Sequence, residues 1–349
     1  MSINKTIAFF GCKNITKTCM EIFRNRVDTI RYLISISPEM GLKNKVSGYM
    51  DLKDFADDNK IKYYAVNNYT LKDKTDIDLI NSLNIDVAFV IGWQRLIPSQ
   101  ILGNLNIGIF GMHGSSDNLP KGRGRSPMNW SLILGKKQFY TNLFKYENNI
   151  DGGGIIGTHC FDIKENDTIE TLHFKNMLSM NMLIEKNYDN IINNNFKLKI
   201  QNEEKATYFP KREPSDGVID WNIKTKNIIN LSKALTHPFP DCYSTIKGEK
   251  ITIWRMNVFS NSFEYPRAEQ GEIIQVFYNN KFLVKTADSV VIVHEYDTRN
   301  INLIKSGNKF DIVDLKSVYK IFEKRYPNFV KRNQMEITLD KMIKGNYIG

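Results

Sequence analysis

The chain has 349 residues, of which 42 % are hydrophobic and 25 % are charged. This composition is ordinary for a soluble globular protein, and the length favours two domains. Lysine and arginine outnumber aspartate and glutamate by 48 to 38, so the formal net charge is +10. That charge permits a nucleic-acid partner but does not require one.

Several classes of protein are excluded at this level. No apolar run approaches the ~20 residues of a membrane helix, and the first residues lack the pattern of a secretory signal. The four cysteines have no CxxC spacing, which predicts reduced thiols in a cytoplasmic protein rather than disulfides or a zinc site. Because no cluster of metal ligands is visible either, we expect no metal.

In the first half of the chain, short apolar runs alternate with amphipathic segments. This alternation predicts an α/β fold, a doubly wound Rossmann-like and mostly parallel sheet. In such a sheet the ligand site lies beyond the carboxyl ends of the strands. The predicted strands are residues 5–10, 29–37, 62–66, 86–91 and 107–110, and the predicted helices are residues 16–26, 52–59 and 74–83.

The pattern changes near residue 190, where asparagine becomes frequent, and residues 205–215 contain two prolines. A helix over 225–235 and a series of short strands follow, which predicts a second, smaller β-rich domain like an open barrel. Those strands are residues 242–246, 250–256, 271–278, 281–286 and 290–295. The predicted domains are a catalytic domain (1–195), a linker (196–215), a β-rich domain (216–300) and a helical basic tail (301–349) with a helix over 311–325.

The region after the fifth predicted strand concentrates residues that can carry chemistry. His113 is followed by a loop rich in Gly, Ser, Pro and Arg (114–127), a predicted helix (128–134) and, later, Asp151 with three glycines after it. A histidine and a carboxylate on one rim can act as an acid/base pair, and glycines 152–154 would let the backbone approach a ligand closely. Spacing alone also fits a surface histidine, a simple turn and a solvated arginine loop.

The order of these residues resembles the family of formyltransferases that use 10-formyltetrahydrofolate. That family carries HxSLLPxxRGxxPxxWAIxxG and, later, DxGxI; here residues 113–135 contain HGSS, LPKGRG, P, WSLI and G in order, and Asp151-Gly-Gly-Gly-Ile follows. Residues 85–102 are similar to the strand and loop that line the folate pocket of the family. Four later segments resemble the C-terminal domain of two-domain members: Ala206-Thr-Tyr with Pro210-Lys, Asp216-Gly-Val-Ile-Asp220-Trp221, Ala234-Leu-Thr with Pro240, and Ile251-Thr-Ile-Trp254.

The resemblance implies an enzyme that moves a formyl group from 10-formyltetrahydrofolate to a primary amine without a metal. His113 would stabilise the oxyanion that forms on attack or move the proton, and Asp151 would hold His113 and help to remove the amine proton. The implied folate-binding residues are Trp93, Gln94, Arg95, Leu96, Ile97, Asp151 and Gly154. The implied residues for the second substrate are Gly111, Ser115, Ser116, Arg123 and Arg125.

One position departs from the family. Its members usually have Asn-x-His, with the asparagine amide on the formyl oxygen, whereas Gly111 stands two residues before His113. A glycine has no side chain that donates, so Ser115, Ser116, Asn118, Asn129 or backbone N–H groups would have to substitute. The loop after His113 is also two residues longer than the family pattern. A catalytically weakened member that acts as a binding protein therefore remains an alternative.

Three branches of the family compete for the acceptor amine. Members that formylate glycinamide ribonucleotide are usually shorter, and those that formylate methionyl-tRNA carry a basic insertion after the second strand. Here that stretch (38–53) has lysines but no arginine, and acids interrupt the linker. We therefore favour a sugar N-formyltransferase acting on a UDP- or dTDP-linked amino-dideoxy sugar for surface glycan synthesis, with methionyl-tRNA formyltransferase as the alternative.

The basic character of the chain lies largely away from these motifs. Residues 316–349 carry eight Lys/Arg and three acids, a net +5, which is half of the excess. We therefore expect anionic small substrates and no nucleic acid. A homodimer, or a C-terminal region that docks a partner or a second subunit, stays open.

Overall fold

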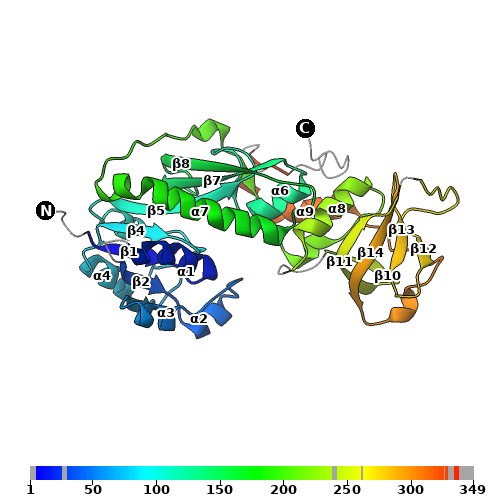
Figure 1. Ribbon diagram of the computed structural model, residues 1–349, viewed down its shortest axis with the longest axis horizontal. Helices are drawn as coiled ribbons and strands as arrows, with labels where there is room; N and C mark the ends of the chain where they lie inside the picture. The colour runs from blue at the N-terminus through cyan, green and yellow to red at the C-terminus, as the bar shows by residue number, and fades with distance from the viewer. Residues whose placement is uncertain are drawn as a thin grey trace. The chain divides into compact units, whose positions relative to one another are not determined.

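The computed structural model describes residues 5–25, 30–237, 242–260, 262–325, 327–328 and 334–337. The chain divides into two compact units that interleave along the sequence (Figure 1). The first unit comprises Met1–Gly114, Tyr140–Phe161 and Phe174–Lys205, and the second Ser115–Phe139, Asp162–His173 and Ala206–Gly349. The continuous domain boundaries expected from the sequence stay a prediction. Some predicted features lie outside the described residues. They are residue 26 of the first predicted helix, residue 29 of the second predicted strand, Pro240 of the C-terminal motif, and residues 331, 332, 341 and 344 of the basic tail.

A seven-stranded sheet forms the first unit, with the strand order β3-β2-β1-β4-β5-β7-β8. The pairs from β3 through β5 are all parallel, which confirms the predicted doubly wound sheet. The strands are β1 (Ile7–Phe10), β2 (Ile30–Ser35), β3 (Lys62–Ala65), β4 (Val87–Val90), β5 (Gly108–Ser115), β7 (Gln138–Lys145) and β8 (Ile155–Asp162).

Alternate side chains of the central strands enter two different cores, because successive residues of a strand point to opposite faces. Phe9 of β1 belongs to a core that also holds Phe89 and Tyr188, while Phe10 belongs to the opposite core with Val90. All four residues of β1 are fully buried, as expected for a strand covered on both faces. The helices of this unit are α1 (Asn14–Glu21), η1 (Ile22–Asn25), α2 (Pro38–Lys43), α3 (Lys53–Asp58), α4 (Lys74–Ser82) and α5 (Ser99–Leu102).

The long helix α7 (Ile169–Ile192) runs along the sheet (Figure 1) and was not predicted. Its inner side buries Leu183 and Ile184, but Phe174, Leu178 and Met182 are more than half exposed. Apolar residues on two sides blur the 3.6-residue period by which an amphipathic helix is recognised. The asparagines near residue 190 therefore lie at the end of this helix.

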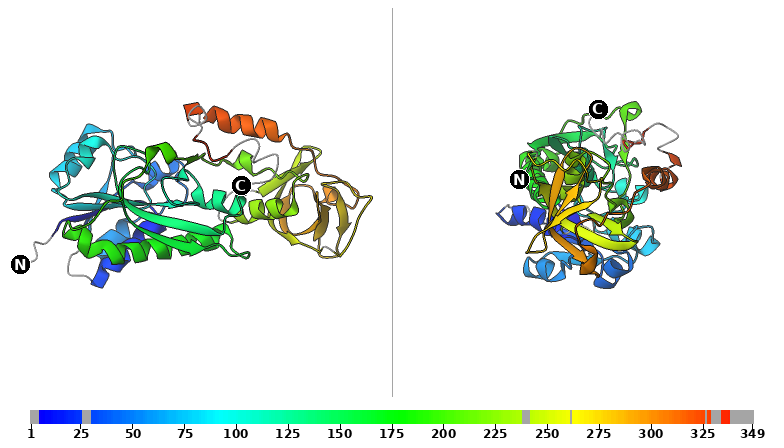
Figure 2. Two further views of the ribbon diagram at one scale, coloured as in Figure 1. Left: turned by 90° about the horizontal axis from the view of Figure 1, so that it is seen from above. Right: turned by 90° about the vertical axis from the view of Figure 1, so that its right-hand side faces the viewer.

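A five-stranded sheet with the order β10-β11-β14-β13-β12 lies in the second unit, and all its pairs are antiparallel. Its strands, yellow and orange in Figure 2, confirm a β-rich second part. They are β10 (Cys242–Ile246), β11 (Glu249–Val258), β12 (Ile273–Val276), β13 (Phe282–Lys285) and β14 (Val290–Thr298). The helices of this unit are α6 (Pro127–Ile133), η3 (Pro214–Gly217), α8 (Thr225–Ala234), η4 (Ile301–Leu303) and α9 (Leu315–Arg325), and η2 (Glu203–Lys205) ends the first unit.

A small parallel ribbon joins three distant stretches of the second unit. Strand β9 (Tyr208–Phe209) pairs with β6 (Arg123–Gly124) on one edge. On its other edge, the Tyr208 N–H donates to the Gln334 carbonyl oxygen at 2.8 Å, and the Glu336 N–H donates to the Tyr208 carbonyl oxygen at 3.1 Å. Part of the predicted linker and part of the predicted tail are thus paired with the loop that follows His113.

Within the described residues, no helix is both long enough and apolar enough to cross a membrane.

Candidate active site

Strand β5 is longer than its apolar run predicts and carries the candidate histidine. The predicted strand stops at residue 110, whereas β5 continues to Ser115, so His113 lies within the strand. Ile109, Gly111 and His113 alternate along β5 and therefore share one face of the sheet. Ile109 packs in the core that holds Trp93 and Phe10. The face on which His113 lies is thus the face covered by the loop after β4.

His113 and Asp151 come together as predicted. The Nδ1 atom of His113 lies 3.5 Å from Oδ2 of Asp151, and the two side chains are only 11 % and 18 % exposed. This separation is slightly longer than an ordinary hydrogen bond, and catalytic contacts commonly shorten when substrate binds. A carboxylate at Nδ1 favours the tautomer with its proton on that nitrogen and leaves Nε2 for proton transfer.

The loop that carries Asp151 is anchored by a glutamine that sequence reasoning missed. The buried Gln201 side chain donates from Nε2 to the carbonyl oxygens of Asp151 and Gly153, at 2.8 and 2.7 Å. A Cβ on Gly153 would lie 1.7 Å from the Lys145 carbonyl oxygen, and one on Gly154 would lie 2.8 Å from Cβ of Leu198. The close approach that these glycines allow is therefore to the chain itself, and a folate contact of Gly154 stays a prediction.

The ring of Tyr146 occupies the place of a side chain at position 111. A Cβ built on Gly111 would lie 2.0 Å from Cε2 and 2.8 Å from Cζ of Tyr146. Tyr146 follows β7 directly, and its N–H donates to the Ile109 carbonyl oxygen at 2.7 Å. Burial, and then the charge of Asp151, raise the pKa of Tyr146. Its hydroxyl therefore stays protonated at neutral pH.

The predicted folate loop begins where β4 ends. The Thr16 hydroxyl donates to the Ile91 carbonyl oxygen at 2.7 Å, and Gly92 has a φ of +76° with Thr16 packed against it. Trp93 then turns inward, and its ring meets Tyr69 at 4.8 Å between centroids. The Gln94 N–H donates to the Tyr69 hydroxyl oxygen at 3.1 Å. Hydrogen bonds to its backbone and the ring contact of Trp93 with Tyr69 therefore both fix the conformation of this loop.

The side chains of this loop differ in burial and in their hydrogen-bond partners. The indole Nε1 of Trp93 is buried and has no hydrogen-bond partner among the described residues, so an acceptor on a ligand would satisfy it. Leu96 is 56 % exposed while Ile97 is buried in the core. The Arg95 guanidinium lies over the Tyr69 ring at 4.7 Å. The loop therefore offers one hydrogen-bond donor and one exposed apolar side chain, and its contact with the folate stays a prediction.

The predicted contacts to the second substrate divide by burial. Ser115 and Arg123 are fully buried and Ser116 nearly so, and the Ser115 hydroxyl donates to the Lys121 carbonyl oxygen at 2.5 Å. Arg123 donates from Nη1 to the Tyr208 hydroxyl oxygen at 3.1 Å. Arg125 is exposed. Burial therefore favours Arg125 over Arg123 as a ligand contact, and the role of each stays a prediction.

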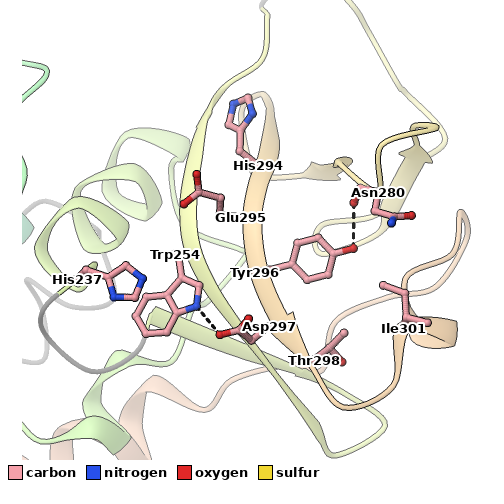
Figure 3. A pocket seen from close by; sticks show the side chains of 9 residues that line it. All are labelled: His237, Trp254, Asn280, His294, Glu295, Tyr296, Asp297, Thr298 and Ile301. Atoms are coloured by element: carbon pink, nitrogen blue, oxygen red, sulfur yellow. Dashed lines mark hydrogen bonds between the residues drawn. The ribbon is translucent and has the colours of Figure 1, made fainter.

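Two cavities of the second unit contain none of the predicted site residues. One, of about 630 Å³, is lined by Trp254 and residues of β14 (Figure 3). His237 stacks on Trp254 at 4.1 Å between ring centroids, in keeping with a packing role for this tryptophan. The other, of about 530 Å³, is lined by five lysines and by Asp167 and Asp288 among others. Across the described part of the chain, no three His, Cys, Asp or Glu residues are grouped to hold a metal.

Two family models match the chain and decide its relationship. The model described as "Formyl transferase" matches residues 5–180, and "Formyl transferase, C-terminal domain" matches residues 211–305. The chain belongs to the formyl transferase family. The first match contains His113, Asp151 and the loop after β4, and the second contains the five-stranded sheet.

A curated relative is similar to part of this formyl transferase. A bifunctional polymyxin resistance protein ArnA from Wigglesworthia glossinidia brevipalpis is 35 % identical over 190 residues, which are 54 % of this chain. The match spans only 29 % of the length of that relative.

Solved structures show the same fold. A crystal structure of WlaRD, described as a sugar 3N-formyl transferase with dTDP and 5-N-formyl-THF, has a TM-score of 0.60 and 23 % identity over 85 % of this chain and 98 % of its own. An N-formyltransferase from Helicobacter canadensis, in complex with folinic acid and dTDP-3-aminofucose, has a TM-score of 0.61 and 21 % identity over 84 % of this chain and all of its own. A 4-N formyltransferase from Francisella tularensis has a TM-score of 0.58, 19 % identity and covers 72 % of this chain and 97 % of its own.

Proposed function

We propose that this formyl transferase moves the formyl group of 10-formyltetrahydrofolate to the primary amine of a nucleotide-linked amino-dideoxy sugar. The observation that carries the proposal is the His113–Asp151 pair in the family-matched residues 5–180, on the sheet face covered by the loop after β4. Bound 10-formyltetrahydrofolate supplies an activated formyl group. The Trp93–Ile97 loop holds the donor, with the unpartnered indole N–H of Trp93 as one polar contact.

His113 accepts the proton of the attacking amine, and Asp151 orients the imidazole of His113. The attacking amine must be neutral, so a base must accept a proton as the new C–N bond forms. His113 Nε2 faces the reaction while Asp151 holds Nδ1, which keeps the imidazole in one orientation and stabilises it when it becomes charged. Their low exposure strengthens this interaction relative to bulk water.

The choice of acceptor rests on a different set of observations. Two of the solved relatives above are described with dTDP or a dTDP-sugar, and the fold of this chain covers 98 to 100 % of them. Arg125 presents an exposed guanidinium on the loop after His113, and such a group pairs well with a diphosphate. A surface that follows a tRNA backbone would need clustered arginine and lysine, which the region after the second strand lacks.

An acceptor panel tests the proposal. Purified protein is incubated with 10-formyltetrahydrofolate and, separately, dTDP- and UDP-linked 3-amino and 4-amino sugars, aminoacylated initiator tRNA and glycinamide ribonucleotide. We expect one class of amino sugar to gain a formyl group. Turnover of tRNA alone would replace the acceptor with methionyl-tRNA, and absence of turnover with every amine would favour the catalytically weakened binding protein.

Three further expectations belong to this proposal. The enzyme works in the cytoplasm, its product enters a surface glycan, and a homodimer is one state to look for in solution. The domain boundaries at residues 195, 215 and 300 are part of the same proposal; the family matches end at residue 180 and begin again at 211, which supports them.

A further inference from the structure

Three polar side chains, those of His113, Asp151 and Tyr146, lie at the face of β5 that carries His113. Gly111 and His113 are two residues apart on this face, and the Asp151 carboxylate lies against the imidazole of His113. The third group is Tyr146, which packs with Ile109 against the same core. Burial, and then the charge of the nearby Asp151, raise the pKa of Tyr146. No motif of the sequence had singled out this tyrosine.

The position of the Tyr146 ring relates it to the missing side chain at residue 111. Its Cε2 and Cζ atoms lie 2.0 and 2.8 Å from the point where a Cβ of residue 111 would stand. The hydroxyl extends from Cζ by one bond. The phenol therefore brings an O–H donor close to the space that an asparagine side chain at position 111 would occupy, on the face of β5 that also carries His113.

Of the four candidate side chains, Asn118 is exposed, and the other three are engaged elsewhere. The Ser115 hydroxyl donates to the Lys121 carbonyl oxygen, the Ser116 hydroxyl donates to Asp117 at 3.3 Å, and the Asn129 amide donates to the Ala234 carbonyl oxygen at 2.8 Å. By contrast, no described residue accepts a hydrogen bond from the Tyr146 hydroxyl. Tyr146 is half-buried, so its hydroxyl is available to a ligand bound in the site.

We propose that Tyr146 is a catalytic residue whose hydroxyl donates a hydrogen bond to the formyl oxygen of the donor as negative charge develops on it. The inference deepens the proposed function and rests on it. The hydroxyl stays protonated throughout: it transfers no proton, and the proton of the amine goes to His113. Gly111 is then explained, because any side chain there would displace the phenol.

Removal of a single oxygen atom tests the role. Tyr146→Phe keeps the ring over Gly111, and we expect kcat to fall about 100-fold, as when one donor of an oxyanion site is removed. The KM values of both substrates and the thermal midpoint should stay close to those of the unchanged enzyme. Tyr64→Phe is the matched control, because Tyr64 is a half-buried tyrosine of β3 and should leave kcat unchanged. A kcat within threefold in Tyr146→Phe would overturn the proposal.

An exchange of the two positions provides a second test. Gly111→Asn alone should abolish activity, because its side chain meets the Tyr146 ring. Tyr146→Ala opens that space and should also lose activity, whereas the double variant Gly111→Asn/Tyr146→Ala should recover about tenfold over Tyr146→Ala, which corresponds to one hydrogen bond. Equal kcat in the single alanine variant and the double variant would contradict the assigned position of the hydroxyl.

A third measurement does not depend on turnover. In protein labelled with ¹³Cζ-tyrosine, the Tyr146 resonance is the one lost in Tyr146→Phe. We expect it to shift when 10-formyltetrahydrofolate saturates the site in the absence of an acceptor amine, while the Tyr64 resonance does not move. We also expect Asp151→Asn to lower the pKa of Tyr146. If 10-formyltetrahydrofolate binds without moving this resonance, the contact is refuted; if the resonance moves but no amine is formylated, the proposed function fails and the contact stands.

Discussion

At the scale of single residues, the site depends on side chains that hold its loops as well as on those that react. Gln201 makes two hydrogen bonds from one amide nitrogen, to the carbonyl oxygens on either side of Gly152. Asp151 itself has a positive φ of 50°, which costs conformational energy for a residue with a side chain. The two hydrogen bonds from Gln201 fix this strained segment opposite His113.

Gln201→Ala should therefore act on Asp151 from a distance. Loss of the amide leaves one buried and one partly buried carbonyl oxygen without this donor, so we expect kcat to fall about tenfold and the free energy of unfolding to fall by about 2 kcal/mol. The KM of the nucleotide sugar should change little. Steady-state kinetics with urea unfolding measure both effects. Gln275→Ala, in the exposed part of β12, is the control, and equal kcat in the two variants would contradict the positioning role.

Alanine substitutions of the two arginines in the loop after His113 should affect different quantities: substrate KM for one and stability for the other. Arg125 is exposed, so Arg125→Ala should raise the KM of the nucleotide sugar about tenfold, by loss of a charge-assisted contact, without a change in stability. Arg123 is fully buried, so Arg123→Ala should lower the free energy of unfolding by about 3 kcal/mol. If instead Arg123→Ala changed only the KM, Arg123 would have to be assigned to the substrate.

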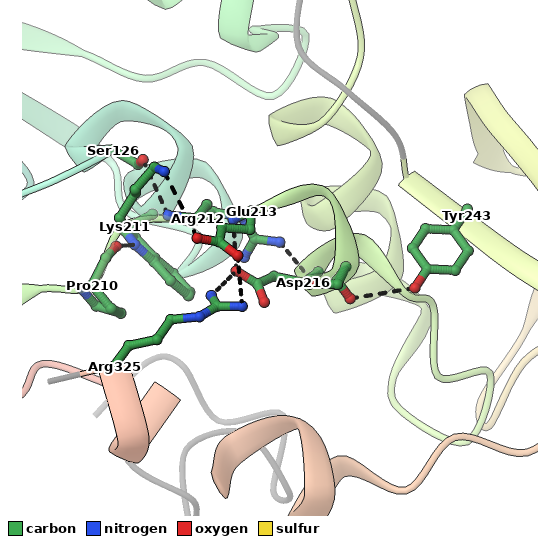
Figure 4. Close-up of polar contacts among 10 residues, drawn as sticks. Ser126, Pro210, Lys211, Arg212, Glu213, Asp216, Tyr243 and Arg325 are labelled. Atoms are coloured by element: carbon green, nitrogen blue, oxygen red, sulfur yellow. Dashed lines mark hydrogen bonds and ion pairs between the residues drawn. The ribbon is translucent and has the colours of Figure 1, made fainter. Parts of the chain in front are cut away.

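At the scale of elements, helix α9 is fastened to the chain just before the β-rich sheet. Arg325 pairs with Asp216 at 2.7 Å and with Glu213 at 3.2 Å, and the Asp216 side chain is only 2 % exposed (Figure 4). The same segment continues to the loop of the site, because the Arg212 N–H contacts the Ser126 hydroxyl oxygen at 3.5 Å and the Arg212 guanidinium lies over the Trp130 ring at 4.8 Å. The basic tail thus contributes a specific ion pair rather than charge alone.

Arg325→Ala should destabilise the second unit. It leaves the Asp216 carboxylate buried without this cation, and we expect the free energy of unfolding to fall by about 2 kcal/mol. Lys324→Ala, one residue earlier and exposed, should change it by less than about 0.5 kcal/mol. Thermal and urea unfolding of both variants provide the comparison. Equal stability of the two would mean that the ion pair adds nothing to the attachment of α9.

At the scale of the whole molecule, hydrophobic patterns along short stretches of sequence predict the central strands of the sheet but miss β7, β8 and helix α7. The strands near residues 7–10 and 87–90 were predicted because each is an uninterrupted apolar run, and both are central in the sheet. Strands β7 and β8 were missed, since polar residues such as Thr141 and Asn142 are buried in β7 through contacts that a single stretch of sequence does not reveal. Helix α7 was missed because its exposed apolar residues blur its periodicity.

The residues of the candidate site also fall into those that the sequence predicts and those that it does not. His113 and Asp151 could be predicted because they lie in motifs that resemble a family, and the structure brings their side chains within 3.5 Å. Gln201 binds the backbone of a residue 50 positions earlier in the chain. The Tyr146 ring packs against Gly111 of another strand. Neither contact can be recognised from the residues next to it in the sequence. The absence of a side chain at Gly111 was visible in the sequence, but its cause was not.

The most direct test of the account is the transfer of a ¹³C-labelled formyl group from 10-formyltetrahydrofolate to the amine of a dTDP-linked amino sugar, measured for the unchanged enzyme and for His113→Asn. We expect a labelled N-formyl product with the unchanged enzyme and a kcat about 1,000-fold lower in His113→Asn, since general acid–base catalysis is lost. Folinic acid affinity and the circular dichroism spectrum should stay the same in both. Equal transfer rates by the two proteins, or no labelled product from any amino sugar, would contradict it.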